Sequence, residues 1–137
     1  MIEIIFFFAL FGVIGVCFEV FINSIQKFMK TREITLMGYS SIWMFFIYGT
    51  SYFIILYVTT FFLNFNILIR GFIYMILFYM LEFSSGFILK KFKMIPWDYS
   101  EFKYNFKGII ALQFAPLWYI GGIFLETIYL YLKPLIF

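Results

Sequence analysis

Apolar residues follow one another along most of this chain, in four long runs separated by short polar stretches. The runs cover residues 4–25, 42–63, 67–89 and 109–132. Each run is long enough to cross a bilayer as a helix, which takes about 20 apolar residues. The apolar residues do not alternate with polar ones, as they would in the strands of a membrane barrel. The pattern therefore predicts an all-α fold, a multi-pass membrane bundle of four transmembrane helices that forms one domain over residues 1–137.

The composition supports this prediction and narrows the chemistry. Hydrophobic residues make up 65% of the chain and charged residues 12%, whereas soluble domains carry about 25% charged residues. These values exclude a soluble enzyme, a disordered tail and a nucleic-acid-binding module, so the expected partner is the lipid bilayer. The single cysteine, Cys17, cannot form an intrachain disulfide. Because histidine is absent, His-based catalytic triads and His-ligated metal sites are excluded as well.

The placement of the basic residues predicts an orientation. Eight of the ten Lys and Arg residues lie in the connections 26–41 and 90–108, which fall on the same side of the membrane if there are four spans. Arg70 and Lys133 lie on the other side. The positive-inside rule then predicts that both basic connections are cytoplasmic and that both termini face away from the cytoplasm. The first run lacks the basic start of a secretory signal, so we expect a retained helix.

The start of the fourth span is ambiguous. The chain is apolar from Gly108 onward, but Pro116 interrupts this run. Proline inside a helix removes a backbone hydrogen bond and kinks or ends the helix. Residues 108–115 therefore either belong to the span or form an interfacial segment before it, and the sequence does not decide between the two.

Three glutamates, Glu19, Glu82 and Glu126, lie inside the apolar runs. A charged residue in the middle of a spanning helix costs about 2.5–3.5 kcal/mol, so such residues face the protein interior or a wet cavity. Each glutamate shares its helix face with glycine and with side chains that form hydrogen bonds. These neighbours are Gly12, Gly15 and Asn23 for the first, Tyr79, Ser85 and Gly86 for the second, and Tyr119, Gly122 and Tyr129 for the third. Such faces are typical of helix–helix contacts in membranes.

The positions of the glutamates within the runs predict how deep they lie. Glu19 and Glu82 are each about 10 Å from the basic side. Two carboxylates that lie close together in a low dielectric cannot both stay ionised at low cost, so we expect at least one to hold a proton. Glu126 would join them if the last span began near Pro116. The alternative is that each glutamate serves only as a hydrogen-bonded contact between helices.

The connection 90–108 is unusually aromatic and basic for a loop. Its aromatic residues are Phe92, Trp97, Tyr99, Phe102, Tyr104 and Phe106. Pro96 favours an extended entry, and Asp98 and Ser100 are typical of turns. One interpretation is an interfacial segment, with Trp and Tyr at the level of the headgroups and lysines against anionic lipid.

The other interpretation of this loop is functional. If the loop folds over the mouth of the bundle, Asp98 and Tyr99 would lie near Glu19 and Glu82. Tyr48, in the second span, would donate a hydrogen bond into the same pocket, although tyrosines at such positions more often line a helix contact or the interface.

Several short motifs carry a family resemblance. They are Phe18-Glu19-Val20, Ile47-Tyr48-Gly49-Thr50-Ser51, Leu81-Glu82-Phe83, Gly86-Phe87-Ile88-Leu89 and Pro96-Trp97-Asp98-Tyr99-Ser100. With these motifs the chain resembles the eukaryotic transmembrane protein 229-like family, which is grouped with bacterial proteins named putative ABC-transporter type IV, or CmpB-like. The resemblance implies a small multi-pass membrane protein, and it matches Glu19, Glu82, Trp97, Asp98, Tyr99 and Glu126 to family positions. Bacterial members have an Arg-Gly-Phe and Gly-Pro-rich element where this chain has Met37-Gly38-Tyr39-Ser40-Ser41, which is closer to the eukaryotic form.

The function expected from these features is that of a permease-like or transport-associated membrane component with a carboxylate-lined polar site. The chain has no phosphate-binding loop of the GxxxxGK[ST] type, so it is not the ATPase of a transporter. Four short spans rarely enclose a pathway alone, so we expect a homo-oligomer or a partner membrane subunit. The alternatives are an accessory membrane protein and a membrane-embedded lipid-modifying enzyme that uses the carboxylates, and the balance is against an enzyme.

The expected site is a polar pocket without an assigned catalytic residue. No cofactor is expected, and whether a metal binds is left open. The candidate pocket residues are Glu19, Asn23, Tyr48, Glu82, Asp98, Tyr99 and Glu126, and the interfacial or structural motif consists of Pro96, Trp97 and Ser100.

Overall fold

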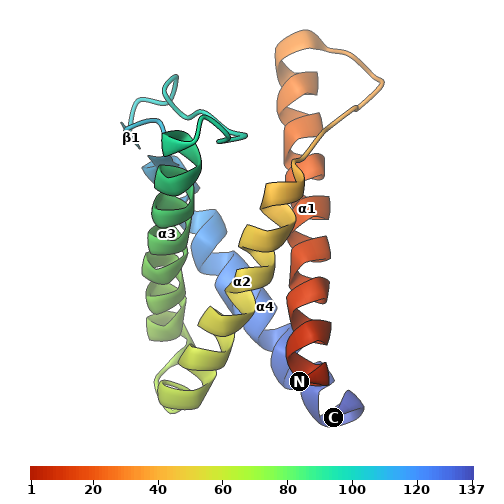
Figure 1. Ribbon diagram of the computed structural model, residues 1–137, viewed down its shortest axis with the longest axis vertical. Helices are drawn as coiled ribbons and strands as arrows, with labels where there is room; N and C mark the ends of the chain where they lie inside the picture. Colours follow the sequence, from red (N-terminus) through yellow and green to blue (C-terminus); the bar gives the residue numbers. More distant parts are fainter. The chain divides into compact units, whose positions relative to one another are not determined.

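Helices make up most of the structure, a computed structural model that describes residues 1–137. The long helices are α1 (Ile2–Thr31), α2 (Ile42–Phe61), α3 (Ile67–Lys91) and α4 (Ala115–Ile136) (Figure 1). Between α3 and α4 lie two short strands, β1 (Asn105–Phe106) and β2 (Ile110–Ala111), followed by the 3₁₀ turn η1 (Leu112–Phe114). All four helices are long and apolar enough to cross a membrane. The predicted all-α, multi-pass membrane protein is thereby confirmed.

The contacts divide the chain into two compact units, residues 1–52 and residues 53–137. The boundary falls inside α2, so the first part of that helix packs with α1 and its last turns belong with α3 and α4. Each unit is described below by itself. The sequence-based prediction of a single domain stays a prediction.

In the first unit, glycines on α1 allow close contact with α2. A methyl group added at Gly15 would lie 2.1 Å from Cγ of Tyr48, and one added at Gly12 would lie 2.8 Å from the ring of Phe45. Small residues at helix contacts let two backbones approach closely in a membrane. α1 extends beyond the predicted end at residue 25 because polar residues that favour helix continue it. It ends at Arg32, which has the left-handed φ of 58° that often closes a helix.

In the second unit, α3 packs along α4 and both helices contribute glycines to the contact. A methyl group at Gly71 of α3 would lie 2.4 Å from the ring of Tyr119, and one at Gly122 of α4 would lie 2.3 Å from Cβ of Tyr74. The start of α3 is fixed by Asn66, whose side chain accepts a hydrogen bond of 2.9 Å from the backbone N–H of Leu68. Each helix of this pair therefore contributes a glycine that faces a tyrosine of the other helix.

The sequence left the role of residues 108–115 open, and in the structure the long helix α4 begins only at Ala115. Strands β1 and β2 pair antiparallel in the preceding segment, with Asn105 opposite Ala111. Between the strands, the N–H of Ile109 donates to the carbonyl of Phe106 at 3.0 Å, which closes a β-turn whose two central residues, Lys107 and Gly108, have positive φ values of 55° and 68°. Pro116 then lies in the first turn of α4, the helical position that proline tolerates best. Residues 108–114 thus precede the helix.

Two adjacent glycines on α4 offer a matched test of this packing. A methyl group at Gly121 meets nothing within 4 Å, in contrast to the overlap with Tyr74 at Gly122. We expect Gly122→Ala to lower the free energy of unfolding by about 1–3 kcal/mol, as overpacking does. Gly121→Ala should change it by less than about 0.5 kcal/mol. Unfolding in mixed micelles with increasing SDS, followed by circular dichroism, measures both values, and equal effects at the two sites would contradict the packing described.

Candidate functional site

The second unit contains a buried carboxyl group on α3, that of Glu82, with incomplete hydrogen bonding. Only 7% of the residue is exposed. Its Oε1 accepts a hydrogen bond of 3.0 Å from the hydroxyl of Tyr99, which lies in the loop before β1. Its Oε2 has no hydrogen-bond partner, and neither has the buried indole N–H of Trp118 on α4. The indole lies close enough to act on the Glu82 carboxyl group, so these two polar atoms, neither of which makes a hydrogen bond, are neighbours in one small site.

The hairpin holds Tyr99 over this carboxyl group. The backbone N–H of Tyr99 donates to the carbonyl of Gly108 at 2.8 Å. The ring packs against Phe102 and Phe114, with centroids 5.7 and 5.1 Å away. Turn geometry and aromatic packing therefore fix the position of the hydroxyl.

Trp97 ties the same loop to α3 and to β2. Its indole N–H donates to the carbonyl of Ile109 at 2.8 Å. The indole ring lies against Gly86, one helical turn after Glu82, where an added methyl group would lie 2.8 Å from the ring and 2.5 Å from Ile109. Because glycine has no side chain, the loop can lie directly on α3 at the level of the carboxyl group.

Asp98, between these two aromatic residues, is exposed and belongs to a turn. Its Oδ1 accepts a hydrogen bond of 2.9 Å from the backbone N–H of Ser100. This bond, together with the Ser100 side chain and the nearby ammonium of Lys90, holds the pKa of Asp98 below its ordinary value. The loop thus presents Tyr99 to Glu82 and keeps Asp98 at its surface, and Pro96 at its entry is exposed too.

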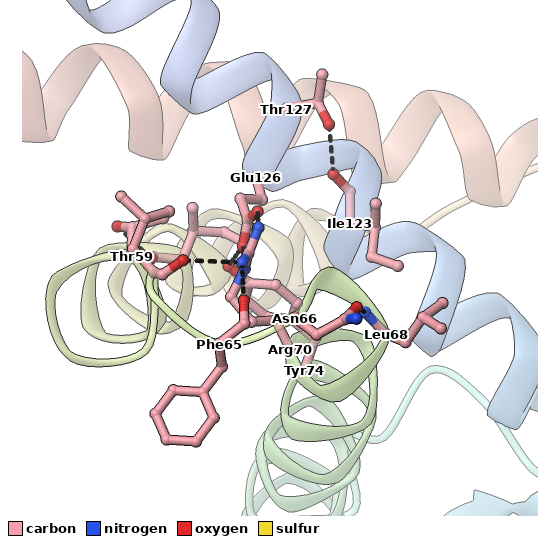
Figure 2. A network of polar contacts seen from close by, with 11 residues as sticks. Thr59, Phe65, Asn66, Leu68, Arg70, Tyr74, Ile123, Glu126 and Thr127 are labelled. Carbon is pink, nitrogen blue, oxygen red and sulfur yellow. Dashed lines mark hydrogen bonds and ion pairs between the residues drawn. The ribbon is translucent and has the colours of Figure 1, made fainter.

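The third glutamate, Glu126 of α4, lies in an ion pair with Arg70 of α3. The guanidinium donates from Nη2 to Oε1 at 2.7 Å and from Nε to Oε2 at 3.0 Å. Tyr74 donates to Oε2 at 2.5 Å. Figure 2 shows Arg70 and Tyr74 of α3 directed at Glu126. Only 2% of Glu126 is exposed, so the pair is a buried one.

Arg70 also closes the turn that leads into α3. Its Nη1 donates to the carbonyl of Leu63 at 3.0 Å and to that of Phe65 (Figure 2). The guanidinium therefore joins the end of the α2–α3 connection to α4. The sequence reasoning counted Arg70 only for orientation, and its one signal was a lone cation inside an apolar run.

The two glutamates of the second unit serve different ends of α3. Arg70 and Glu82 are 12 residues apart, or about 18 Å along a helix. Glu126 is thus placed with Arg70 and Tyr74, away from Glu82.

The first unit contains the remaining candidate residues. Glu19 of α1 accepts a hydrogen bond of 2.6 Å from the hydroxyl of Ser40, and Asn23 donates to the carbonyl of Tyr39 at 2.8 Å. The segment before α2 thus folds back along α1. Close contact is possible at Gly38, where an added methyl group would lie 2.1 Å from the Val20 carbonyl oxygen. Tyr48 packs its ring on α1 at Gly15. Because Glu19 and Glu82 belong to different units, their predicted proximity stays a prediction.

Within each unit, no group of three or more His, Cys, Asp or Glu side chains is arranged to hold a metal ion. What the second unit offers chemically is a carboxyl group that one tyrosine covers, next to an indole donor. Such a group can bind or release a proton or attract a cation, because one of its oxygens is unsatisfied.

Comparison with known proteins gives one family. The family described as "Putative ABC-transporter type IV" matches residues 6–136, nearly the whole chain. The match contains both units and all the carboxyl groups described above. No solved structure matches the chain.

Removal of one partner from the buried ion pair should destabilise the second unit strongly. We expect Arg70→Met and Glu126→Met each to lower the free energy of unfolding by about 3–5 kcal/mol, because each leaves a buried polar partner unpaired. The double variant Arg70→Met/Glu126→Met should lose less than the sum of the single losses. SDS unfolding of the four proteins gives the coupling energy, and a coupling near zero would contradict the pair.

The turn at Asp98 should weaken in acid. Its pKa is lower in the folded protein than its ordinary value of 3.8, so the ionised form stabilises the turn above that value. This contribution is lost as the pH falls through the folded-state pKa. Hydrogen-exchange protection of residues 99–109, corrected for intrinsic rates, should fall between pH 6 and pH 2.5. Asp98→Asn should reduce this pH dependence, and Glu101→Gln should leave it unchanged. The same pH dependence in both variants would refute the role of Asp98 in the turn.

Proposed function

The chain belongs to the putative ABC-transporter type IV family, and we propose that it is a transport-associated membrane component that works through the carboxyl group of Glu82. The observation that carries the proposal is the unsatisfied Oε2 of this buried group, which lies beside the unpaired indole N–H of Trp118. Ionisable groups inside membrane spans occur chiefly along ion, proton or substrate pathways. An unsatisfied pair of buried polar atoms costs about 1–3 kcal/mol for each group, which a passing proton, water or cation would recover.

Tyr99 acts in this proposal as a gate. Its hydroxyl is the hydrogen-bond donor to Glu82, and it comes from a loop rather than from a helix. Because Tyr99 is not part of a helix, the loop that carries it could move away from Glu82, with loss of its packing on Phe102 and Phe114, while the helices stay unchanged. Movement of Tyr99 would expose Glu82 to the side of the membrane on which the loop lies, and its return would cover the group again.

The pathway requires more protein than one chain, and we propose a homo-oligomer or a partner membrane subunit that contributes the remaining wall. The proposal also gives a role to a second carboxyl group, Glu19 of the first unit, with Asn23 and Tyr48 on the same helix pair. It also includes the cytoplasmic placement of the connections 26–41 and 90–108. We also propose that the chain is related to the transmembrane protein 229-like proteins, and the Met37–Ser41 segment supports this relationship.

A second candidate, an accessory membrane protein, is favoured by a different observation. Glu126 is fully paired with Arg70 and Tyr74, and its role is to hold α3 against α4. If Glu82 served the same purpose, the whole chain would be a scaffold for partner helices. Glu82 differs from Glu126 in having an unsatisfied oxygen, and for this reason the accessory role is the second candidate.

Proton flux through the purified protein tests the proposal. The chain is reconstituted in liposomes that contain a pH-sensitive dye, and a K⁺ diffusion potential drives protons inward. We expect uptake faster than in protein-free liposomes, because Glu82 relays protons, and we expect Glu82→Gln to return the rate to that background. Tyr99→Phe keeps the ring but removes the donor that holds the gate, so it should raise the rate.

The matched control is Glu33→Gln, which removes a carboxylate that is exposed and paired with Lys27. It should leave the flux unchanged, since exposed ion pairs contribute little. A wild-type rate equal to that of protein-free liposomes, or equal rates for wild type and Glu82→Gln, would contradict the proposal and favour the accessory role.

A further inference from the structure

A hollow on the second unit lies where α3 ends and the hairpin turns. Its volume is about 510 Å³, and its lining residues are Phe87, Lys90, Lys91, Lys107 and Ile109. Three of the five side chains carry ammonium groups and two are apolar. None of the three lysines takes part in the Glu82 or Glu126 sites, so the hollow is a separate feature of the molecule.

Two of the three exposed lysines, Lys90 and Lys107, have contacts within the second unit. Nζ of Lys90 donates to the backbone carbonyl of Lys107 at 2.6 Å, which joins the end of α3 to the hairpin turn. An ammonium group has three donors, so Lys90 keeps two for a ligand. Lys107 has its Nζ 5.6 Å from the ring centre of Phe106 and a left-handed backbone at the turn.

The electrostatics of the hollow favour an anion. The carboxylate of Asp98 acts on Lys90, and the carbonyl end of α3 carries partial negative charge. The positive charge of the three ammonium groups exceeds the negative charge of one carboxylate and the half charge at the end of the helix. The three lysines come from two elements, Lys90 and Lys91 from the last turn of α3 and Lys107 from the hairpin turn, and they line the hollow mainly through their carbon chains.

The apolar part of the lining indicates where that phosphate comes from. Phe87 is 51% exposed and lies one turn before Lys90 and Lys91 on a helix long and apolar enough to span a membrane. Ile109 is buried and forms apolar floor. A ligand that places phosphate on the lysines would therefore place its next atoms along an apolar, lipid-facing helix surface. A free phosphate has nothing to occupy that part.

We propose that the hollow formed by Phe87, Lys90, Lys91, Lys107 and Ile109 binds the headgroup of an anionic phospholipid. The phosphate lies among the three ammonium groups, and an acyl chain follows α3 past Phe87. The inference is independent of the proton pathway proposed above, since it uses none of the same side chains.

Native mass spectrometry of the purified full chain tests the binding. The protein in detergent is mixed with dioleoyl phosphatidylglycerol or dioleoyl phosphatidylcholine, and the retained lipid is counted. We expect phosphatidylglycerol to be retained preferentially. Each lysine near a charged membrane contributes about 1 kcal/mol, or about fivefold in affinity, so the triple variant Lys90→Gln/Lys91→Gln/Lys107→Gln should lose the preference. Single Lys91→Gln and Lys107→Gln variants, which keep the bond from Lys90, should each lose about fivefold.

The matched control is the triple variant Lys27→Gln/Lys30→Gln/Arg32→Gln, which removes the same charge from the first unit. It should keep the preference. An equal loss of phosphatidylglycerol preference in the two triple variants would show only a general attraction between basic residues and anionic lipid, and it would overturn the proposal. Displacement of the lipid by millimolar inorganic phosphate would show a site for free phosphate and would overturn it too. If the lysine triple variant fails to fold, retention unchanged in both single variants is the result that overturns it.

Discussion

Polar groups inside a span must find partners within the protein, because hydrocarbon offers none, and this constraint organises α3. The helix begins with a charged group, Arg70, and carries a carboxyl group, Glu82, three turns later. At its start the charge is balanced by Glu126, which also accepts a hydrogen bond from Tyr74, and the remaining donors of Arg70 close the preceding turn. At Glu82 the loop after the helix supplies one donor, and one oxygen stays without a partner. The first arrangement is complete and the second is not, which is why function is assigned to Glu82.

Close approach of backbones makes both arrangements possible. Gly71 and Gly122 bring α3 and α4 together at the level where Arg70 and Tyr74 reach Glu126. Gly86 does the same for the loop, since its missing side chain leaves room for Trp97 and Ile109. Without these approaches the donors would be too short to reach across, and each glutamate would lie against lipid. A carboxyl group buried between helices therefore requires a glycine near the glutamate on the same helix face, because the glycine lets the partner come close enough.

Much of the fold follows from the sequence, because four apolar runs of more than 20 residues have one physical solution in a bilayer. The runs do not reveal where each helix ends when polar residues still favour helix, as after residue 25, or when apolar residues form something else. Residues 109–114 are apolar except for Gln113, yet they precede α4, because the chain must first complete the hairpin at Lys107 and Gly108. Apolar character indicates burial in the membrane zone, and it does not distinguish a helix from a short interfacial strand.

The sequence predicts which carboxyl groups of the candidate site are buried, but it does not predict their hydrogen-bond partners. The cost of a carboxyl group in hydrocarbon identifies Glu82 and Glu126 as buried against protein, whatever the partners are. The partners themselves are 17 residues away for Tyr99 and 56 residues away for Arg70, and no local pattern links them. Arg70 was assigned to orientation alone because a cation near a span end is expected at the interface.

The hairpin between α3 and α4 connects the two features for which function is proposed. The carbonyl of Gly108 holds the backbone of Tyr99, and the carbonyl of the preceding residue, Lys107, holds the side chain of Lys90. One turn thus positions the tyrosine that covers Glu82 and a lysine of the basic hollow. A ligand that binds Lys90 and Lys107 together would steady this turn, and with it the hydroxyl of Tyr99 over the carboxyl group. The proposed lipid site and the gate would then depend on neighbouring carbonyls of one turn, which is a physical route from membrane composition to the buried site.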